Sequence, residues 1–489
     1  MRVKASLLLL LLLLLVAPQF SAAQTADSQP LNTIQVAAWL TAGISSARLA
    51  RLVTERGLAN LPTHHELQQL ESCGAGKDLI KVLNSGNVQS PLIGAAIPES
   101  LVKAGADARQ QNLHQAELSL RTLVAADSEN SALHLALGVM LRQQEQFDDA
   151  DDELELAVKL MPDLAENHSA LAYLFYRLDD GPNAIAEART ALSIDPKNAE
   201  AYQYLGLGHY SIGQYQAAVH AYAESLTRDH DNPDTLYDMG IALHASGNLP
   251  AAIAAYERAI RIRPAFWEAH SNLGLIRHEE GNLAAAEREY REAKKIAPEE
   301  ASVRNNLGNT YCDQGKFDAA IGEMQELYRQ HPEWQQGHSC LASAYLSKNN
   351  YNGAVAELKL AVEQNPAGAR EHVVLGQALL LDNQVEEAVR ELRIAVQLNP
   401  ESDVAHHLLG TALFQQQDMH AAEREFREAV RVKASADNHY SLAACLMTED
   451  RYQEALSELE TAARLDPERS LYRARREELL KLMKGMDSR

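Results

Sequence analysis

AEAYQYLGLGHYSIGQYQAAVHAYAESLTRDH, residues 199–230, decides the fold of this chain. Apolar residues recur in it at helical spacing on both sides of Gly213. A glycine at such a midpoint adopts a positive φ and ends a helix, so the stretch predicts two helices joined by a tight turn. We expect the small residues Gly206 and Ala218 to face each other where the two helix backbones approach closely. The stretch is therefore predicted to be a helix hairpin.

This hairpin pattern returns along the chain at a fixed interval. Its clearest marker is an alanine that recurs every 34 residues, and after 33 residues at the last step. Such a period is typical of stacked repeat proteins. The repeats fill residues 95–467 and leave little chain in which to build a catalytic domain. The marker alanines are Ala116, Ala150, Ala184, Ala218, Ala252, Ala286, Ala320, Ala354, Ala388, Ala422 and Ala455.

Other positions keep the same interval. Before all but the first marker alanine stands a large apolar residue and then Gly or Ala, as Leu205 and Gly206 stand before Ala218. Proline follows most of the alanines, as Pro196 follows Ala184, and is expected to stop the second helix of the hairpin. Four copies have glycine at the midpoint: Gly213, Gly247, Gly281 and Gly315.

These residues resemble the tetratricopeptide repeat. The resemblance implies an all-α fold, a right-handed superhelical solenoid of about eleven helix hairpins, whose first helices line a concave surface. The copy in residues 199–230 departs from the family's pattern at Ser225 and His230. The first copy is degenerate, and residues 468–489 are expected to form a C-terminal capping helix and tail. The matching residues of the quoted copy are Tyr202, Leu205, Gly206, Gly213, Tyr215, Ala218 and Tyr222.

The concave surface is the candidate binding site that this resemblance implies. The side chains one place along from the packing positions of each first helix would face a ligand there. Tyrosine and histidine supply contact area together with hydrogen bonds, and asparagine can bond a peptide backbone. Aromatic residues that only fill gaps between neighbouring helices remain the alternative. The candidate residues are Tyr173, Tyr176, Gln203, Tyr210, Tyr237, His244, His278, Asn305 and Asn309.

The sequence therefore predicts a non-catalytic exported scaffold that binds a protein or an extended peptide. A structural component of an envelope assembly or export machine is one alternative, and a carbohydrate-binding solenoid is another. We expect no enzyme activity, cofactor or metal. His65 and His278 each precede a glutamate, but neither begins a zinc-binding HExxH motif, because Gln69 and Asn282 stand where the second histidine would be.

The ends of the repeat array carry further expectations. Residues 1–23 look like a cleaved signal peptide, with basic residues, a leucine run and small residues before Gln24, so the protein would be periplasmic or extracellular. No other segment is apolar enough to span a membrane. Residues 24–30 are a short N-terminal segment, residues 31–85 read as a small domain of four helices, and residues 86–94 read as a linker. The net charge of −22 disfavours nucleic acid as a partner. The oligomeric state stays open.

Four cysteines occur in the chain: Cys73, Cys312, Cys340 and Cys445. Cys312 and Cys340 fall in the first helices of neighbouring repeats, but at unlike positions, about two turns out of level. A disulfide does not tolerate such an offset. We therefore expect buried, unpaired cysteines, and the absence of a CxxC spacing argues against a structural zinc site.

Overall fold

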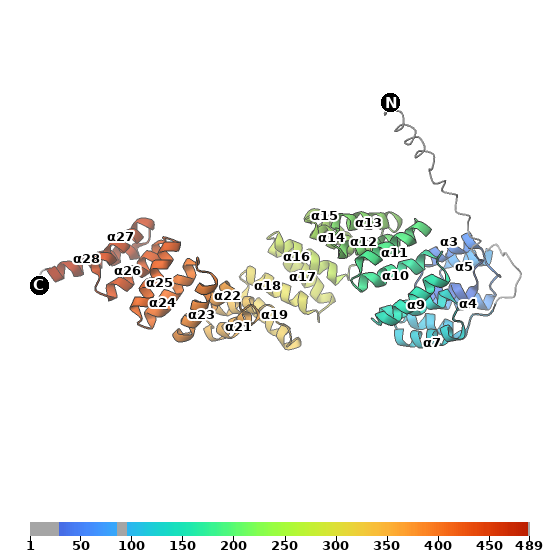
Figure 1. Ribbon diagram of the computed structural model, residues 1–489, viewed down its shortest axis with the longest axis horizontal. Coiled ribbons are helices and arrows are strands. Elements are labelled where there is room, and N and C mark those ends of the chain that lie inside the picture. Colours follow the sequence, from blue (N-terminus) through green and yellow to red (C-terminus); the bar gives the residue numbers. More distant parts are fainter. Residues whose placement is uncertain (1–28, 86–94, 488–489) are drawn as a thin grey trace, which may run out of the picture. The chain divides into compact units, whose positions relative to one another are not determined.

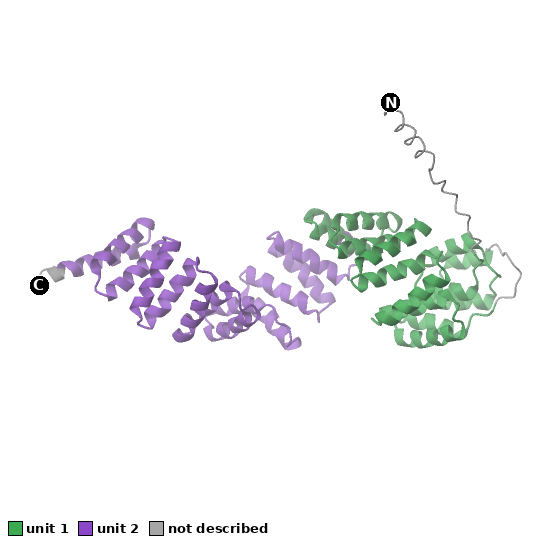
Figure 2. Ribbon diagram, in the orientation of Figure 1, with its two compact units in different colours: residues 1–255 green, residues 256–489 purple. Residues whose placement is uncertain are grey.

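The computed structural model describes residues 29–85 and 95–487, and this part of the chain folds into 27 helices (Figure 1). The expected signal peptide, most of the segment 24–30 and the linker 86–94 lie outside the described residues. The chain divides into two compact units, Met1–Ala255 (unit 1) and Tyr256–Arg489 (unit 2), and the division falls within one helix of the array (Figure 2). The all-α solenoid predicted from the repeats is confirmed.

The helices follow one another as eleven pairs, each with a first helix A and a second helix B. Four helices precede the pairs: α2 (Thr33–Thr41), α3 (Ser46–Arg56), α4 (His64–Cys73) and α5 (Lys77–Ser85). The pairs of unit 1 are α6 (Glu99–Arg109) with α7 (Leu113–Ala126), α8 (Ser131–Gln143) with α9 (Phe147–Leu160), α10 (Ala165–Arg177) with α11 (Gly181–Ile194), α12 (Ala199–Ser211) with α13 (Tyr215–Arg228), and α14 (Pro233–Ala245) with α15 (Leu249–Ile262), whose last residues belong to unit 2.

Unit 2 continues the same alternation. Its pairs are α16 (Trp267–Glu279) with α17 (Leu283–Ile296), α18 (Ala301–Asp313) with α19 (Phe317–Gln330), α20 (His338–Ser347) with α21 (Tyr351–Gln364), α22 (Ala369–Leu381) with α23 (Val385–Leu398), α24 (Asp403–Gln415) with α25 (Met419–Val432), and α26 (Ala436–Thr448) with α27 (Tyr452–Leu465); the single helix α28 (Ser470–Asp487) follows. No helix of the described chain has the length and apolarity needed to cross a bilayer.

Every A–B turn contains one residue in the left-handed region. The four midpoint glycines have φ between 70° and 80°, as the sequence predicts. In the other seven turns a residue with a side chain takes the same conformation, which is sterically unfavourable for it. A glycine is therefore sufficient but not necessary for the turn. The seven residues are Gln111, Glu145, Asp179, Asn349, Asn383, Gln417 and Asp450.

The core of each hairpin is built on the marker alanines, all of which are fully buried. At Gly206 the nearest atoms of helix B belong to Tyr222 rather than to Ala218. A Cβ added at Gly206 would lie 2.5 Å from the ring of Tyr222. Tyr222 lies one helical turn beyond Ala218 on the same face of α13, so its ring, rather than the alanine, occupies the space that the glycine leaves. Gly274 with Tyr290 and Gly410 with Phe426 repeat this arrangement.

A histidine–glutamate pair ties helix A to helix B in seven of the repeats. In each pair the histidine Nδ1 lies 2.5–2.9 Å from a carboxylate oxygen of the glutamate 19 residues later. In four pairs the other ring nitrogen lies 2.9–3.1 Å from a backbone carbonyl six residues earlier. The pairs are His134–Glu153, His168–Glu187, His270–Glu289, His338–Glu357, His372–Glu391, His406–Glu425 and His439–Glu458.

Cys312 and Cys340 form a disulfide, with Cα atoms 5.9 Å apart, so the expectation that they stay unpaired is wrong. That expectation assumed that neighbouring A helices lie level with each other. The structure instead brings the last turn of one A helix against an earlier part of the next, which for Cys340 is the first turn of α20. Arg142 at the end of α8 likewise donates to the carbonyl of Ala170, 28 residues later, at 3.4 Å. Cys73 and Cys445 are free and buried.

The four N-terminal helices pack on the first repeats. Helix α2 contacts α6 and α8, and α4 contacts α6. Residues Val36 to Leu40 of α2 are all buried, and so are most residues of α8. In Figure 1 the blue helices α3, α4 and α5 lie beside the first repeats. Residues 31–85 therefore cover the A helices at the start of the array.

Candidate binding groove

The A helices α8, α10, α12 and α14 of unit 1 line two adjacent cavities. One has a volume of about 210 Å³ and the other about 320 Å³. Arg142 and Gln143 of α8 and Tyr204 of α12 line both, so the two cavities are neighbours. We call this surface, together with Tyr176, Tyr210 and Asp238, the tyrosine groove. It is the largest gathering of the predicted site residues in the described chain.

Tyrosine rings form much of this surface. The ring of Tyr173 lies 5.1 Å from that of Tyr204 and 6.0 Å from that of Tyr176, measured between centroids. The guanidinium of Arg142 stacks over Tyr173 at 4.4 Å. Burial raises the pKa of Tyr176 and of Tyr204, so both hydroxyls keep their protons and can donate hydrogen bonds. Ring faces and hydroxyls suit a ligand that is apolar along one side and polar along the other.

The carboxylate of Asp238 lies near the rings of Tyr176 and Tyr204. Asp238 of α14 accepts a hydrogen bond of 2.8 Å from the amide of Gln203, which lines the larger cavity. Burial, together with the neighbouring Asp234, raises the pKa of Asp238 to about 7, although the hydrogen bond from Gln203 lowers it. The negative charge of Asp238 in turn contributes to the raised pKa values of Tyr176, Tyr204 and Tyr222. The charge of Asp238 therefore affects the protonation of the three tyrosines around it.

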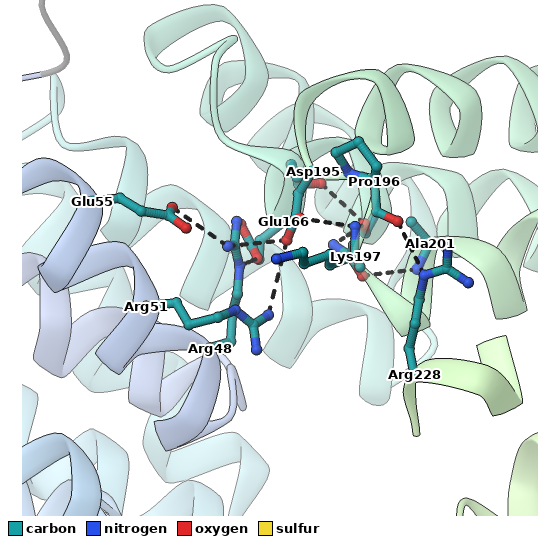
Figure 3. Close-up of polar contacts among 12 residues, drawn as sticks. Arg48, Arg51, Glu55, Glu166, Asp195, Pro196, Lys197, Ala201 and Arg228 are labelled. Carbon is teal, nitrogen blue, oxygen red and sulfur yellow. Dashed lines mark hydrogen bonds and ion pairs between the residues drawn. The ribbon is translucent and has the colours of Figure 1, made fainter. Parts of the chain in front are cut away.

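The turn before helix α3 lines the smaller cavity through Ala42, Gly43 and Ile44, and α3 itself is tied to the repeats beside it. Arg48 lies 2.5 Å from Glu166 at the start of α10 and 3.0 Å from Asp195 at the end of α11 (Figure 3). Arg51 approaches Asp195 only at 4.0 Å. Arg48 also lines a third cavity of about 370 Å³ together with Lys197 and Glu200. The N-terminal helices are therefore held on the A helices by buried ion pairs as well as by apolar contacts.

The structure brings four of the predicted site residues together. Tyr173 and Gln203 line the larger cavity, and Tyr176 and Tyr210 belong to the aromatic cluster beside it. The ring of Tyr210 lies 5.5 Å from Tyr215 of α13. The predicted residues Tyr237 and His244 follow on α14, each half-buried.

The other three predicted residues belong to unit 2. His278 is bonded through Nε2 to Asp313, 2.7 Å away. Asn305 is only 6% exposed, so little of its side chain is available to a ligand. Asn309 is half-buried on α18. The described fold thus divides the predicted site residues between two units.

The sequence analysis did not identify three residues of the groove: Arg142, Tyr204 and Asp238. Tyr204 and Asp238 stand one place beyond the positions that we expected to face a ligand. One signal was available for Asp238, because it is an acid in the middle of the otherwise apolar run Leu236–Ile241. No local signal marks Arg142, whose role depends on how the next A helix crosses α8.

One group of possible metal ligands occurs among the described residues. His420, Glu423 and Glu449 have ligand atoms within 4.8 Å of one another. Arg451 pairs with both glutamates, and Arg427 pairs with Glu423. Because these arginines already balance the carboxylates, we assign no metal to the group.

Profiles of tetratricopeptide repeats match the chain over more than half of its length. One, described as "Tetratricopeptide repeat", matches residues 101–165, 169–234, 305–369, 339–403 and 407–470. Another with this description matches residues 268–300, and one described as "TPR repeat" matches residues 240–281. No curated protein matches the chain.

Several solved structures are similar to it. MamA from Desulfovibrio magneticus RS-1 is 21% identical with a TM-score of 0.33, over 34% of this chain and 95% of that one. Pseudomonas aeruginosa pilF is 19% identical with a TM-score of 0.39, over 43% and 95%. Yeast Tom70 is 14% identical with a TM-score of 0.32, over 78% and 95%. These likenesses concern the repeat fold alone.

Proposed function

Because the chain belongs to the tetratricopeptide repeat family, we propose that it is a non-catalytic scaffold that binds an extended peptide of a protein partner in the tyrosine groove. Proteins of this family are generally protein-interaction scaffolds. The observation that carries the proposal is the pair of adjacent cavities lined by Tyr173, Gln203 and Tyr204. Tyrosine rings give contact area at little entropic cost, and the amide of Gln203 supplies a polar contact beside them.

We also propose that the protein is exported, on the signal-like pattern of residues 1–23. The net charge of −22 supports a protein partner over a nucleic acid. Purification of the protein from the envelope or the medium of its host, followed by N-terminal sequencing, tests the export. A mature chain that begins at Gln24 is expected, and an intact Met1 on a cytoplasmic protein would contradict it.

Selection of random displayed peptides on the purified protein tests the groove. Peptides are expected to bind the wild type and to be lost from a Tyr173→Ala/Tyr204→Ala variant, because both rings are removed from the cavities. Tyr351→Ala, which removes a tyrosine from α21 in unit 2, is the matched control and should keep the peptides. Circular dichroism checks that all variants fold.

Two results would contradict the proposal. Peptides that bind the Tyr173→Ala/Tyr204→Ala variant as tightly as the wild type would place the site elsewhere. A protein that enriches no peptide but binds a glycan array through the same tyrosines would be a carbohydrate-binding solenoid instead.

A further inference from the structure

Asp238 has no basic partner among the residues that the structure describes. Its hydrogen bond comes from the neutral amide of Gln203. The charged group nearest to it on its own helix is another acid, Asp234. The surrounding helices contribute tyrosines: Tyr176 from α10, Tyr204 from α12 and Tyr222 from α13. Asp238 is half-buried, and a carboxylate that has lost part of its hydration without gaining a counter-ion is unfavourable, so a ligand that brings a positive charge would stabilise it.

A second carboxylate of the groove, the more exposed Glu200, also has no ion-pair partner in the described chain. Glu200 at the start of α12 lines the smaller cavity, and no ion pair joins it to a basic side chain of the described chain. Its side chain reaches solvent, but protein surrounds the cavity, and the loss of water raises its pKa. Glu166, which lines the same cavity and is paired with Arg48, also raises the pKa of Glu200, whereas Arg142 lowers it.

The two arginines of the groove, Arg142 and Arg177, already interact with other groups. Arg142 stacks on Tyr173 and donates to the carbonyl of Ala170. Arg177 pairs with Glu145 at 3.0 Å and stacks over Phe147 at 5.1 Å. Neither arginine forms an ion pair with Asp238 or Glu200. The groove therefore holds two carboxylates, Asp238 and Glu200, that form no ion pair within the described chain and lie next to tyrosine rings.

From this charge and geometry we infer that the tyrosine groove is selective for a basic side chain, lysine or arginine, of an extended peptide, held between the ring of Tyr204 and the carboxylate of Asp238. A cation over a tyrosine face gains attraction from the ring, and a carboxylate adds a charge-assisted hydrogen bond. The net charge of −22 would also draw basic partners toward the protein. The inference rests on the proposed function and specifies the partner's chemistry.

The peptides selected in the preceding experiment provide the test. The pool that depends on Tyr173 and Tyr204 should be enriched in lysine or arginine at one position. A fluorescent copy of one selected peptide should bind Asp238→Asn about 10–100-fold more weakly than the wild type, as expected for the loss of a charged hydrogen bond. Replacing its basic residue with norleucine should cause a similar loss, and the two losses should not add.

Asp152→Asn is the matched control. Asp152 of α9 lines a separate cavity, which is formed mostly by α9 with single residues of α10 and α11, and its substitution should leave the affinity unchanged. A selected pool with no basic position, or a peptide that binds Asp238→Asn as tightly as the wild type, would overturn the inference while leaving the proposed function intact. A failure of the proposed function is distinct, because no pool would then depend on Tyr173 and Tyr204.

Discussion

At Gly206 the backbone of α12 passes so close to Tyr222 that an added methyl group would lie within 3 Å of three atoms of its ring. Gly206→Ala should therefore destabilise the protein by about 1–3 kcal/mol, the usual cost of overpacking. Tyr222→Leu should lose stability on its own, because it opens a cavity. Urea unfolding followed by circular dichroism measures both changes.

The double variant Gly206→Ala/Tyr222→Leu separates this contact from other causes. The smaller leucine makes room for the methyl group, so the double variant should be more stable than the sum of the two single losses predicts. Simple additivity would mean that Gly206 is required for some other reason, such as helix geometry.

Replacing a left-handed turn residue with glycine should instead increase the stability of the protein. Gln417 has φ 65° in an exposed turn, where its Cβ is unfavourably placed. Gln417→Gly should stabilise unit 2 by about 0.5–1 kcal/mol, the steric relief less the added freedom of glycine in the unfolded chain. Asn383→Gly, at φ 62°, should gain less, because asparagine tolerates this conformation. Thermal unfolding compares the two, and a loss in Gln417→Gly would contradict the argument.

Individual residues differ in how far the sequence predicts them. The residue type of Gly213 predicts its positive φ, because no other residue adopts that conformation so easily. Gln417 adopts it without any sequence signal, since position in the repeat, rather than residue type, sets the turn. Asp238 was missed for a similar reason: its environment is created by Gln203 and by three tyrosines from other helices.

Between helices A and B, the two histidine–glutamate pairs at His134 and His168 depend on protonation. In His168 both ring nitrogens face acceptors, the Glu187 carboxylate and the Pro162 carbonyl, so both must carry a proton. Burial lowers the pKa of His168, but these hydrogen bonds outweigh it and the net pKa lies above 6.5. The bond to Glu153 likewise raises the pKa of His134.

The sign of the pH dependence follows. A histidine whose pKa is higher in the folded state stabilises the fold fully below about pH 6.5, and this stabilisation is lost as pH rises through the folded value. We expect about 1 kcal/mol for each of His134 and His168. The urea midpoint of the wild type should therefore fall between pH 6 and pH 9 by more than that of His134→Gln/His168→Gln.

His209→Gln is the control for that comparison. His209 is also buried, but its Nδ1 bonds to the neutral Gln214 at 2.8 Å. Its substitution should leave the difference between pH 6 and pH 9 as it is in the wild type. Equal pH dependence in the wild type and in His134→Gln/His168→Gln would show that the pairs stay neutral.

The disulfide between α18 and α20 gives a redox prediction. It closes a loop of 28 residues, which in the chain-entropy account contributes roughly 3–4 kcal/mol. Reduction, or Cys312→Ala/Cys340→Ala, should lower the urea midpoint of unit 2. Alkylation of the unfolded, unreduced protein should modify only Cys73 and Cys445. Modification of all four cysteines would show that the bond does not form.

The same disulfide shows why element packing was harder to predict than the elements. Periodicity fixes where each helix begins and ends, because it records which residues are buried. It does not record the crossing of neighbouring A helices, which decides that Cys312 meets Cys340 and that Gln203 meets Asp238. The shortened helix α20, which follows Gly337 at φ 96°, is a further departure from the register of the repeats.

At the scale of the molecule, the repeat period predicts the solenoid, but it does not predict how the N-terminal helices pack. Their packing on α6 and α8 has no periodic signal, and it depends on side chains more than a hundred residues apart. Arg48 and Glu166 are the clearest case, with side chains 11% and 6% exposed. The groove of unit 1 is therefore bounded partly by a segment that the repeat pattern does not describe.

Arg48→Ala should loosen that segment. It leaves the buried Glu166 without its cation, and breaking a buried ion pair costs roughly 3–5 kcal/mol. The amides of residues 33–56 should exchange hydrogen faster, as mass spectrometry of peptides would report, while α12 and α13 keep their protection.

Arg51→Ala is the control, since Arg51 is 46% exposed and lies 4.0 Å from Asp195. Faster exchange should be partly reversed in Arg48→Ala/Glu166→Ala, where no charge is left unpaired. Equal exchange in Arg48→Ala and Arg51→Ala would mean that the apolar contacts of α2 alone hold the N-terminal helices on the repeats.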